Sequence, residues 1–144
     1  MTYNDTLTLV NRTEEVERIP GFLDALCQAT GCNPKVSFNL NVALEEVVVN
    51  VINYAYPQDG REYTFTLDVK AVREKDDTLL TFTLKDQGVQ FDPTQAKDAD
   101  TTLSAQEREI GGLGIYLVRQ LMDSVSYQYV NGTNVLTMTK RVVK

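Results

Sequence analysis

The sequence contains no histidine, and this absence excludes several kinds of chemistry. Without an imidazole, the chain cannot supply a histidine general base, a Ser-His-Asp triad or a phosphohistidine of its own. Its two cysteines, Cys27 and Cys32, have no histidine with which to complete a zinc site. We therefore expect both cysteines to be reduced, structural thiols.

Basic residues are also scarce relative to acidic ones. The chain has 14 Lys and Arg residues against 20 Asp and Glu residues, a net charge of −6. Broad electrostatic binding to nucleic acid or to anionic lipid needs a basic surface, so this balance excludes both as expected partners. An anionic nucleotide would have to be bound through local hydrogen-bond donors and a metal ion.

No apolar run approaches the length of a membrane span, and residues 1–5 lack the basic and apolar regions of a signal peptide. We therefore expect a cytoplasmic protein. The 144 residues are 42% hydrophobic and 24% charged, which is typical of one ordinary globular domain. We expect this domain to span residues 1–144.

Hydrophobic periodicity predicts three main helices. The first begins at an N-cap at Thr13, is kinked or split at Pro20-Gly21, and ends at Gly31. The second begins at Asn33-Pro34 and stops before Pro57. The third spans residues 115–122.

Alternating apolar and polar residues predict about five strands. The expected strands are residues 6–10, 61–72, 80–86, 125–130 and 134–142. Asn131-Gly132 is a strong signal for a hairpin turn between the last two. Residues 93–111 are polar and long for a loop within a small domain, which is typical of a functional lid or of partial disorder.

The resulting order, β-α-α-β-β-lid-α-β-β, has strands joined mainly as hairpins. Hairpins give a chiefly antiparallel sheet, and its helices should then gather on one face. The predicted fold class is therefore α+β, a two-layer sandwich.

The second predicted helix carries a polar stripe on an otherwise apolar surface. Glu46, Asn50 and Asn53 follow one another at positions i, i+4 and i+7, so they share one narrow face. Buried polar groups need partners, and a ligand pocket is one environment that supplies them. Backbone groups or water within the fold could equally satisfy these side chains.

Two further motifs consist of types of residue that bind nucleotides. Asp86, at a strand end, could accept a hydrogen bond from an exocyclic amine such as that of adenine, while Gly88 lets a base approach the backbone. Gly111-Gly112-Leu113-Gly114 opens a helix whose free backbone N–H groups suit a phosphate. Each motif alone is common in ordinary turns.

The order of these motifs resembles the GHKL (Bergerat-type) ATP-binding superfamily of gyrase, histidine kinases and MutL. Within it, the chain is most similar to the small bacterial anti-sigma-factor serine kinases. Four features carry this likeness: Glu46-x-x-x-Asn50, Tyr54-Ala-Tyr56, Phe91-Asp92-Pro93, and the ending from Gly132 to Lys140.

The resemblance implies a role for each matching residue. Glu46 would be the general base, and Asn50 would bind Mg²⁺. Asp86 would accept the adenine amine, and residues 93–111 would close as a lid. The residues implied to contact ATP are Asn50, Asn53, Asp86, Gly88, Gly112, Leu113, Gly114 and Thr133. Lys97 and Arg108 are both open candidates for a contact with the γ-phosphate.

The resemblance also implies partners. It predicts an ATP-dependent serine/threonine kinase that regulates transcription by holding a sigma factor and phosphorylating a STAS-type anti-sigma-factor antagonist, and a homodimer. The alternatives are a non-catalytic, ATP-gated binding module and a detached histidine-kinase catalytic domain. Gln90 and Tyr54 depart from residues common in the family, a second glycine and a histidine.

Overall fold

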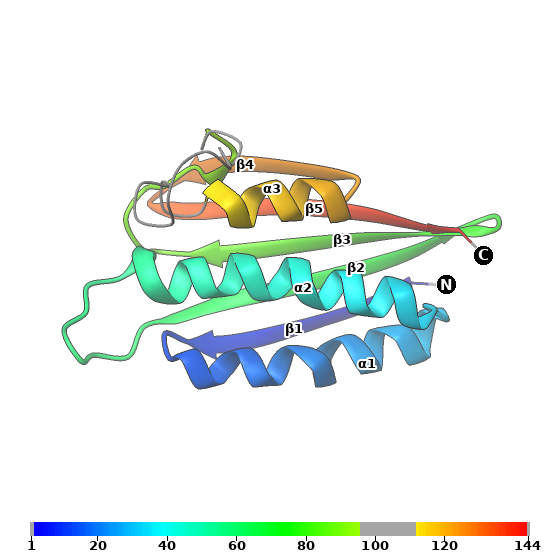
Figure 1. The fold of residues 1–144 in the computed structure, drawn as a ribbon, viewed down its shortest axis with the longest axis horizontal. Coiled ribbons are helices and arrows are strands. Elements are labelled where there is room, and N and C mark those ends of the chain that lie inside the picture. Colours follow the sequence, from blue (N-terminus) through cyan, green and yellow to red (C-terminus); the bar gives the residue numbers. More distant parts are fainter. Residues whose placement is uncertain (1, 96–111, 144) are drawn as a thin grey trace.

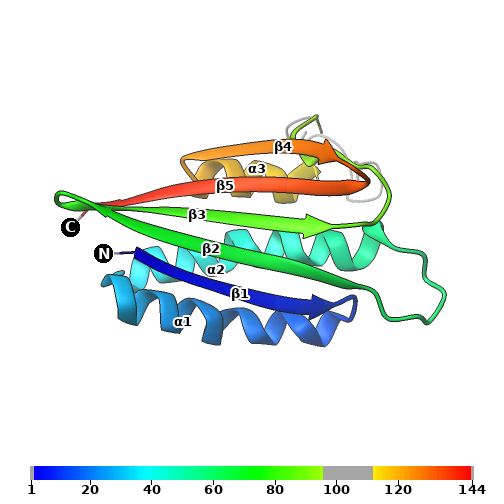
Figure 2. The ribbon, with the colours of Figure 1, turned by 180° about the vertical axis from the view of Figure 1, so that it is seen from behind.

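The computed structural model describes residues 2–95 and 112–143. In these ranges, an antiparallel five-stranded sheet in the order β1-β2-β3-β5-β4 carries the helices on one face (Figure 1). The other face of the sheet lies open (Figure 2). The predicted α+β sandwich is thus confirmed. Its strands are β1 (Thr2–Val10), β2 (Thr64–Glu74), β3 (Asp77–Asp86), β4 (Ser124–Val130) and β5 (Thr133–Val143).

The alternation within the strands separates the core from the open face, as predicted. In β2, Phe65, Leu67 and Val69 are buried beneath the helices, whereas Thr64 and Lys70 are exposed. Two neighbouring strands repeat the pattern, since successive side chains of a strand point to opposite faces. Their buried residues are Leu80, Phe82 and Leu84 of β3 and Leu136 and Met138 of β5.

The first predicted helix is split, as its Pro-Gly pair indicated. Residues Thr13–Arg18 form a 3₁₀ helix, and α1 (Ile19–Thr30) begins beside Pro20, whose missing N–H costs nothing in a first turn. The predicted cap at Thr13 is wrong: Arg12 occupies the cap position, without a side-chain hydrogen bond. Gly31 ends α1 with φ of 80°, a left-handed conformation that glycine adopts without strain.

Helix α2 (Pro34–Asn50) begins as predicted, because the side chain of Asn33 accepts a hydrogen bond of 2.8 Å from the backbone N–H of Val36. The helical segment then continues to just before Pro57, as predicted, but the form of its last turn was not predicted. Residues Val51–Ala55 continue the helix as a π-helical turn, which widens the backbone just where Asn53 and Tyr54 leave the core.

Helix α3 (Gly112–Leu121) lies beside the C-terminal half of α2 and over β5 (Figure 1). Its inner side is buried at Ile115 and Val118, and Met122, just after the helix, is buried as well. The hairpin between β4 and β5 turns at Asn131 and Gly132, whose positive φ values of 50° and 78° are those of the predicted turn. In the parts of the chain that the structure describes, no helix combines the length and apolar character that a membrane span requires.

Candidate functional site

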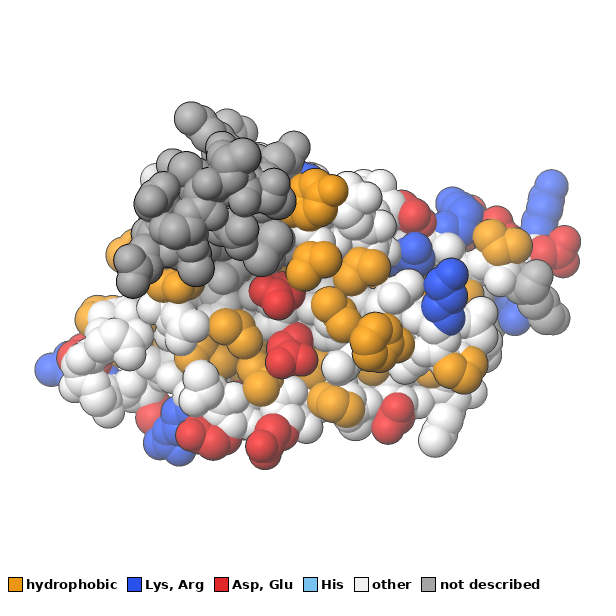
Figure 3. Space-filling model, viewed as in Figure 1, with side chains coloured by type: hydrophobic (Ala, Val, Ile, Leu, Met, Phe, Trp, Pro, Cys, Tyr) orange, Lys and Arg blue, Asp and Glu red, His pale blue; other side chains and the backbone are white. Residues whose placement is uncertain are grey.

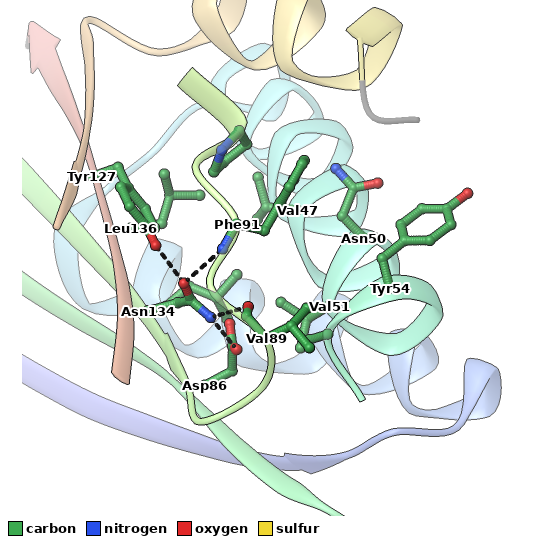
Figure 4. A pocket seen from close by; sticks show the side chains of 13 residues that line it. Val47, Asn50, Val51, Tyr54, Asp86, Val89, Phe91, Tyr127, Asn134 and Leu136 are labelled. Carbon is green, nitrogen blue, oxygen red and sulfur yellow. Dashed lines mark hydrogen bonds between the residues drawn. The ribbon is translucent and has the colours of Figure 1, made fainter. Parts of the chain in front are cut away.

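A pocket opens between the end of α2, the loop after β3 and the first half of β5 (Figure 4). The empty space between its walls, counted together with the open solvent at its mouth, is about 470 Å³. Most of its wall is apolar, and its polar side chains come from the end of the α2 segment, the last residue of β3, β4 and β5. The lining residues are Val47, Asn50, Val51, Tyr54, Ala55, Leu84, Asp86, Val89, Phe91, Pro93, Tyr127, Asn134 and Leu136.

Asp86 is the charged residue of this lining, and it is only 7% exposed. As the last residue of β3, it lies on the core face of the sheet, below the mouth of the pocket. Its Oδ1 accepts hydrogen bonds from the backbone N–H of Gly88 (3.0 Å) and from the amide of Asn134 (2.9 Å). No residue in the described ranges donates a hydrogen bond to its Oδ2, so that oxygen remains able to accept one from a ligand.

Burial raises the pKa of Asp86 above its ordinary value, because a charged carboxylate loses hydration in the pocket. The hydrogen bonds from Asn134 and Gly88 act in the opposite direction, since they stabilise the charged form. The effect of burial is the larger one, so the pKa of Asp86 is raised overall. Such a combination of desolvation and specific donors is typical of residues in binding sites.

Asn134 is a pocket residue that the sequence motifs do not indicate; the residue that they imply to contact the nucleotide is its neighbour Thr133. Strand alternation places Asn134 on the core face with Leu136 and Met138, at 5% exposure and in contact with Asp86. Thr133 is not among the residues that line the pocket. The sequence signal that could have revealed Asn134 is a polar residue at a position of β5 where the alternation places an apolar, core-facing one.

The loop after Asp86 is held against the end of α2. The backbone N–H of Val89 donates to the carbonyl of Ala55 at 2.8 Å, and the N–H of Gln87 donates to the hydroxyl of Tyr56 at 3.3 Å. A Cβ added at Gly88 would overlap the backbone of Ala55. Glycine is therefore required here for packing against Ala55 of the π-helical turn, and its expected role in admitting a base stays a prediction.

The predicted polar stripe reaches the pocket only in part. Asn50 lines its rim together with Tyr54 (Figure 4), whereas neither Glu46 nor Asn53 is a lining residue. Glu46 is half-buried one turn before Asn50, and Asn53 is exposed. In the described ranges, no residue forms a hydrogen bond or ion pair with the side chains of Glu46 and Asn50. Both therefore keep oxygen atoms that can interact with a ligand.

The predicted glycine-rich helix start is present as the first turn of α3, which contains Gly112 and Gly114 and follows residues outside the described ranges. The predicted lid, residues 93–111, lies mostly in the undescribed part, as do Lys97 and Arg108. Among the described residues, no three His, Cys, Asp or Glu side chains gather as a metal site.

The arrangement has a defined chemical capacity. One buried carboxylate oxygen can accept a hydrogen bond deep in an apolar slot, where a flat heterocyclic ring would fit. The amide of Asn50 lies at the pocket rim, and α3 directs its N-terminal end to the same side of the molecule as the end of α2 (Figure 1). The slot with Asp86 suits an amine-bearing ring, and the rim with Asn50 and the N-terminus of α3 suits an anionic tail of the same elongated ligand.

Comparisons with known proteins agree with this architecture. The model of the histidine kinase-like ATPase domain matches residues 9–140. A Bordetella bronchiseptica protein, the serine/threonine-protein kinase BtrW, is 29% identical over 105 residues, which cover 73% of this chain and 70% of that one. The serine-protein kinase RsbW of Listeria monocytogenes is 29% identical over 146 residues, which cover 95% of this chain and 86% of that one.

Among solved structures, the chain is similar in fold to part of a crystal structure of the RsbU and RsbW domains of a Mycobacterium tuberculosis protein. The TM-score is 0.65 at 15% sequence identity, and the match covers 99% of this chain. It covers 33% of the other chain, so the likeness concerns one part of a longer protein.

Proposed function

The chain belongs to the histidine kinase-like ATPase family, and on this premise we propose that it is an ATP-dependent serine/threonine kinase that acts as an anti-sigma factor. Its similarity to proteins named serine-protein kinases supports the choice of a hydroxyl acceptor. The observation that carries the proposal is the buried Asp86, which keeps Oδ2 available in a slot of apolar side chains.

The nucleotide would enter with its adenine toward Asp86. The exocyclic amine would donate to Oδ2, and the ring would lie among Val51, Val89 and Leu136. The ribose and phosphates would then extend past Asn50 toward the start of α3. We further propose that Asn53, Leu113 and Thr133 contact the nucleotide, and that residues 93–111 close over it as a lid.

The phosphate end would be held by Asn50 and by the backbone N–H groups of Gly112 and Gly114 at the α3 N-terminus. Asn50 fits Mg²⁺, because its amide has no partner among the described residues and hard cations prefer oxygen ligands. A Mg²⁺ held by Asn50 would neutralise negative charge on the phosphates. Mg²⁺ commonly keeps several waters and shares its remaining ligands with phosphates, which agrees with the absence of a carboxylate cluster in the described ranges.

Glu46 would act as the general base. It lies one helical turn before Asn50 and has no partner among the described residues, so it can take the proton of an incoming serine hydroxyl. Because phosphoryl transfer depends mainly on positioning and charge neutralisation, one base and one helix N-terminus suffice beside the metal. The acceptor that we propose is a STAS-type anti-sigma-factor antagonist, with a homodimeric kinase in the cytoplasm.

A phosphotransfer assay tests this function. Purified protein, ATP and Mg²⁺ are incubated with the STAS partner recovered from the native cell, and phosphoserine or phosphothreonine is quantified by mass spectrometry. Glu46→Gln should keep its ATP affinity and lose transfer by about 100-fold or more, since a general base contributes on that order. Glu45→Gln is the matched control, because Glu45 is an exposed neighbour and its variant should transfer normally. A product confined to histidine would overturn the assignment.

The second candidate is an ATP-gated binding module with little chemistry. Glu46 does not line the pocket, which favours this candidate, since nucleotide binding alone needs no general base. In that case, ATP would still switch partner binding in Glu46→Gln, and the unchanged protein would also leave the partner unphosphorylated.

A further inference from the structure

Asn134 uses its entire hydrogen-bonding capacity within the protein. Its Nδ2 donates to Oδ1 of Asp86 at 2.9 Å and to the carbonyl of Val89 at 2.8 Å. Its Oδ1 accepts from the backbone N–H of Phe91 at 3.1 Å and from the hydroxyl of Tyr127 (Figure 4). A neutral amide has two donors and two acceptor sites, so none is left for a ligand.

The four partners also determine the orientation of this amide. A rotation that exchanged its nitrogen and oxygen would turn the oxygen toward two acceptors, Asp86 and the Val89 carbonyl. The amide nitrogen would then meet the Phe91 N–H. Such a pairing leaves donors and acceptors unsatisfied at a site that is only 5% exposed, which is costly. Asn134 is therefore restricted to one arrangement.

This arrangement acts on Asp86. Asn134 and the Gly88 N–H both bind Oδ1, so the carboxylate cannot rotate without breaking two hydrogen bonds, and only Oδ2 is left for a ligand. We propose that Asn134 is a positioning residue that makes the pocket selective for a base with an exocyclic amine. The proposal rests on the function proposed above and names the residue that enforces its base selectivity.

The chemistry of the discrimination follows from charge. An amine donates its hydrogen to the fixed carboxylate oxygen, whereas a carbonyl oxygen at the same ring position, as in hypoxanthine, presents a lone pair to it. Like polarity in a buried slot is unfavourable. A carboxylate freed from Asn134 could turn aside, or take up a proton, and would then admit both kinds of base.

The test compares nucleotides in direct binding titrations. ATP, purine riboside triphosphate, which lacks the amine, and inosine triphosphate, which carries the carbonyl, are titrated into the full chain and into Asn134→Leu. The unchanged protein should bind ATP with at least roughly tenfold higher affinity than either of the other two nucleotides, since a hydrogen bond to a charged group usually contributes about that much. We refer to this quotient of affinities as the ratio. In Asn134→Leu we expect this ratio to fall to about one, since the carboxylate is no longer oriented.

The ratio separates positioning from general damage, because a loosened pocket weakens all three nucleotides alike and leaves the ratio unchanged. A second readout is pH: without the Asn134 donor, the pKa of Asp86 rises further, so ATP affinity should start to fall at a higher pH than in the unchanged protein. Thr137→Val, on the opposite face of β5, is the control and should keep both the ratio and the pH profile.

The outcomes are distinct. A folded Asn134→Leu with an unchanged ratio would overturn the positioning role and leave the proposed function intact. No ATP binding by the unchanged protein would overturn both. If Asn134→Leu does not fold, Tyr127→Phe replaces it in the test. This variant removes the hydrogen bond from the Tyr127 hydroxyl to Oδ1 of Asn134 and should reduce the ratio by about threefold. A Tyr127→Phe ratio equal to that of the unchanged protein would then overturn the role.

Discussion

At the scale of the residue, Asp86 is subject to two opposed requirements. Its burial raises its pKa, which means that the folded protein binds this proton more tightly than the unfolded chain does. Deprotonation of Asp86 therefore lowers the stability of the unliganded protein as the pH rises through the raised pKa. The ionised form is nevertheless the one that accepts a hydrogen bond from an amine most strongly.

Replacing the carboxylate by its amide should separate these requirements. We expect Asp86→Asn to unfold at a temperature equal to or above that of the unchanged protein at pH 7, because the cost of burying a charge is removed. Its ATP affinity should fall by about 10- to 150-fold, the range for one hydrogen bond to a charged group. Thermal unfolding by circular dichroism and calorimetric titration measure the two quantities. A lower unfolding temperature with unchanged ATP affinity would contradict this account.

The pH dependence of binding has a definite sign. ATP affinity should be greatest above the pKa of Asp86 and should decrease as the pH falls through that raised value, earlier than for an ordinary aspartate. Titrations between pH 4.5 and 8 (about the range of a stable domain) would reveal it. Asp86→Asn is the control, since it retains the titration of ATP itself and lacks that of the carboxylate. Parallel profiles for the two proteins would contradict the assignment.

At the scale of the element, the loop of residues 87–91 depends on contact with α2. Gly88 allows the loop to lie directly on Ala55, and the hydrogen bond from Val89 to the Ala55 carbonyl joins the two segments. The floor of the pocket is therefore a packed contact between a loop and a helix end.

Gly88→Ala should be destabilising, because its methyl group would overlap the Ala55 backbone and force the loop away from α2. We expect a loss of about 1–3 kcal/mol in the free energy of unfolding, typical of overpacking, together with weaker ATP binding. Gly21→Ala in α1 is the matched control: nothing lies within 4 Å of its added Cβ. There, alanine should raise stability by about 0.5–1 kcal/mol through its helix propensity. Equal effects at both positions would contradict the packing argument.

The start of α2 provides an independent test of the fold. Asn33→Ala removes the side-chain acceptor of the Val36 N–H and should cost about 1 kcal/mol in urea unfolding. Asn39→Ala makes the same substitution within α2, where its side chain has no hydrogen-bond partner among the described residues, and should be neutral or slightly stabilising. A neutral Asn33→Ala would show that the cap does not stabilise the helix.

Local rules predicted most elements, because a strand that buries one face must alternate and because glycine and proline permit few backbone conformations. Leu67 and Phe82 face the core as expected, and Gly31 ends its helix. The π-helical turn at Val51–Ala55 could not be predicted, because it depends on how this segment packs against the loop after β3. Thr13 failed as a cap because an alternative 3₁₀ start was equally compatible with the sequence.

The site was predictable to a lesser degree than the fold. Asp86 was recognised because an aspartate before a glycine at a strand end is a local pattern. Asn134 was not, because the partners of its four hydrogen bonds lie 7–48 residues away in sequence. The roles of Glu46 and Asn50 stay predictions, although the structure places Asn50 at the pocket rim.

At the scale of the whole molecule, the strand order assembles the pocket. Because β5 lies between β3 and β4, Asn134 reaches Asp86 on one side and Tyr127 on the other. The end of the α2 segment closes the slot from the helical side of the sheet. Helix α3 lies beside α2, with its N-terminus at the same end of the molecule as the C-terminus of α2 (Figure 1). On this helical face, apolar and acidic side chains gather at the centre, and Lys and Arg side chains lie toward the edges (Figure 3).

The most direct test of the central claim is a calorimetric titration of the full chain with ATP in the presence of Mg²⁺, beside Asp86→Asn. We predict saturable binding with one nucleotide per chain, and a loss of about tenfold or more in affinity for the variant. Binding that is absent at millimolar ATP, or that is equal in the two proteins, would contradict the claim that Asp86 recognises the base.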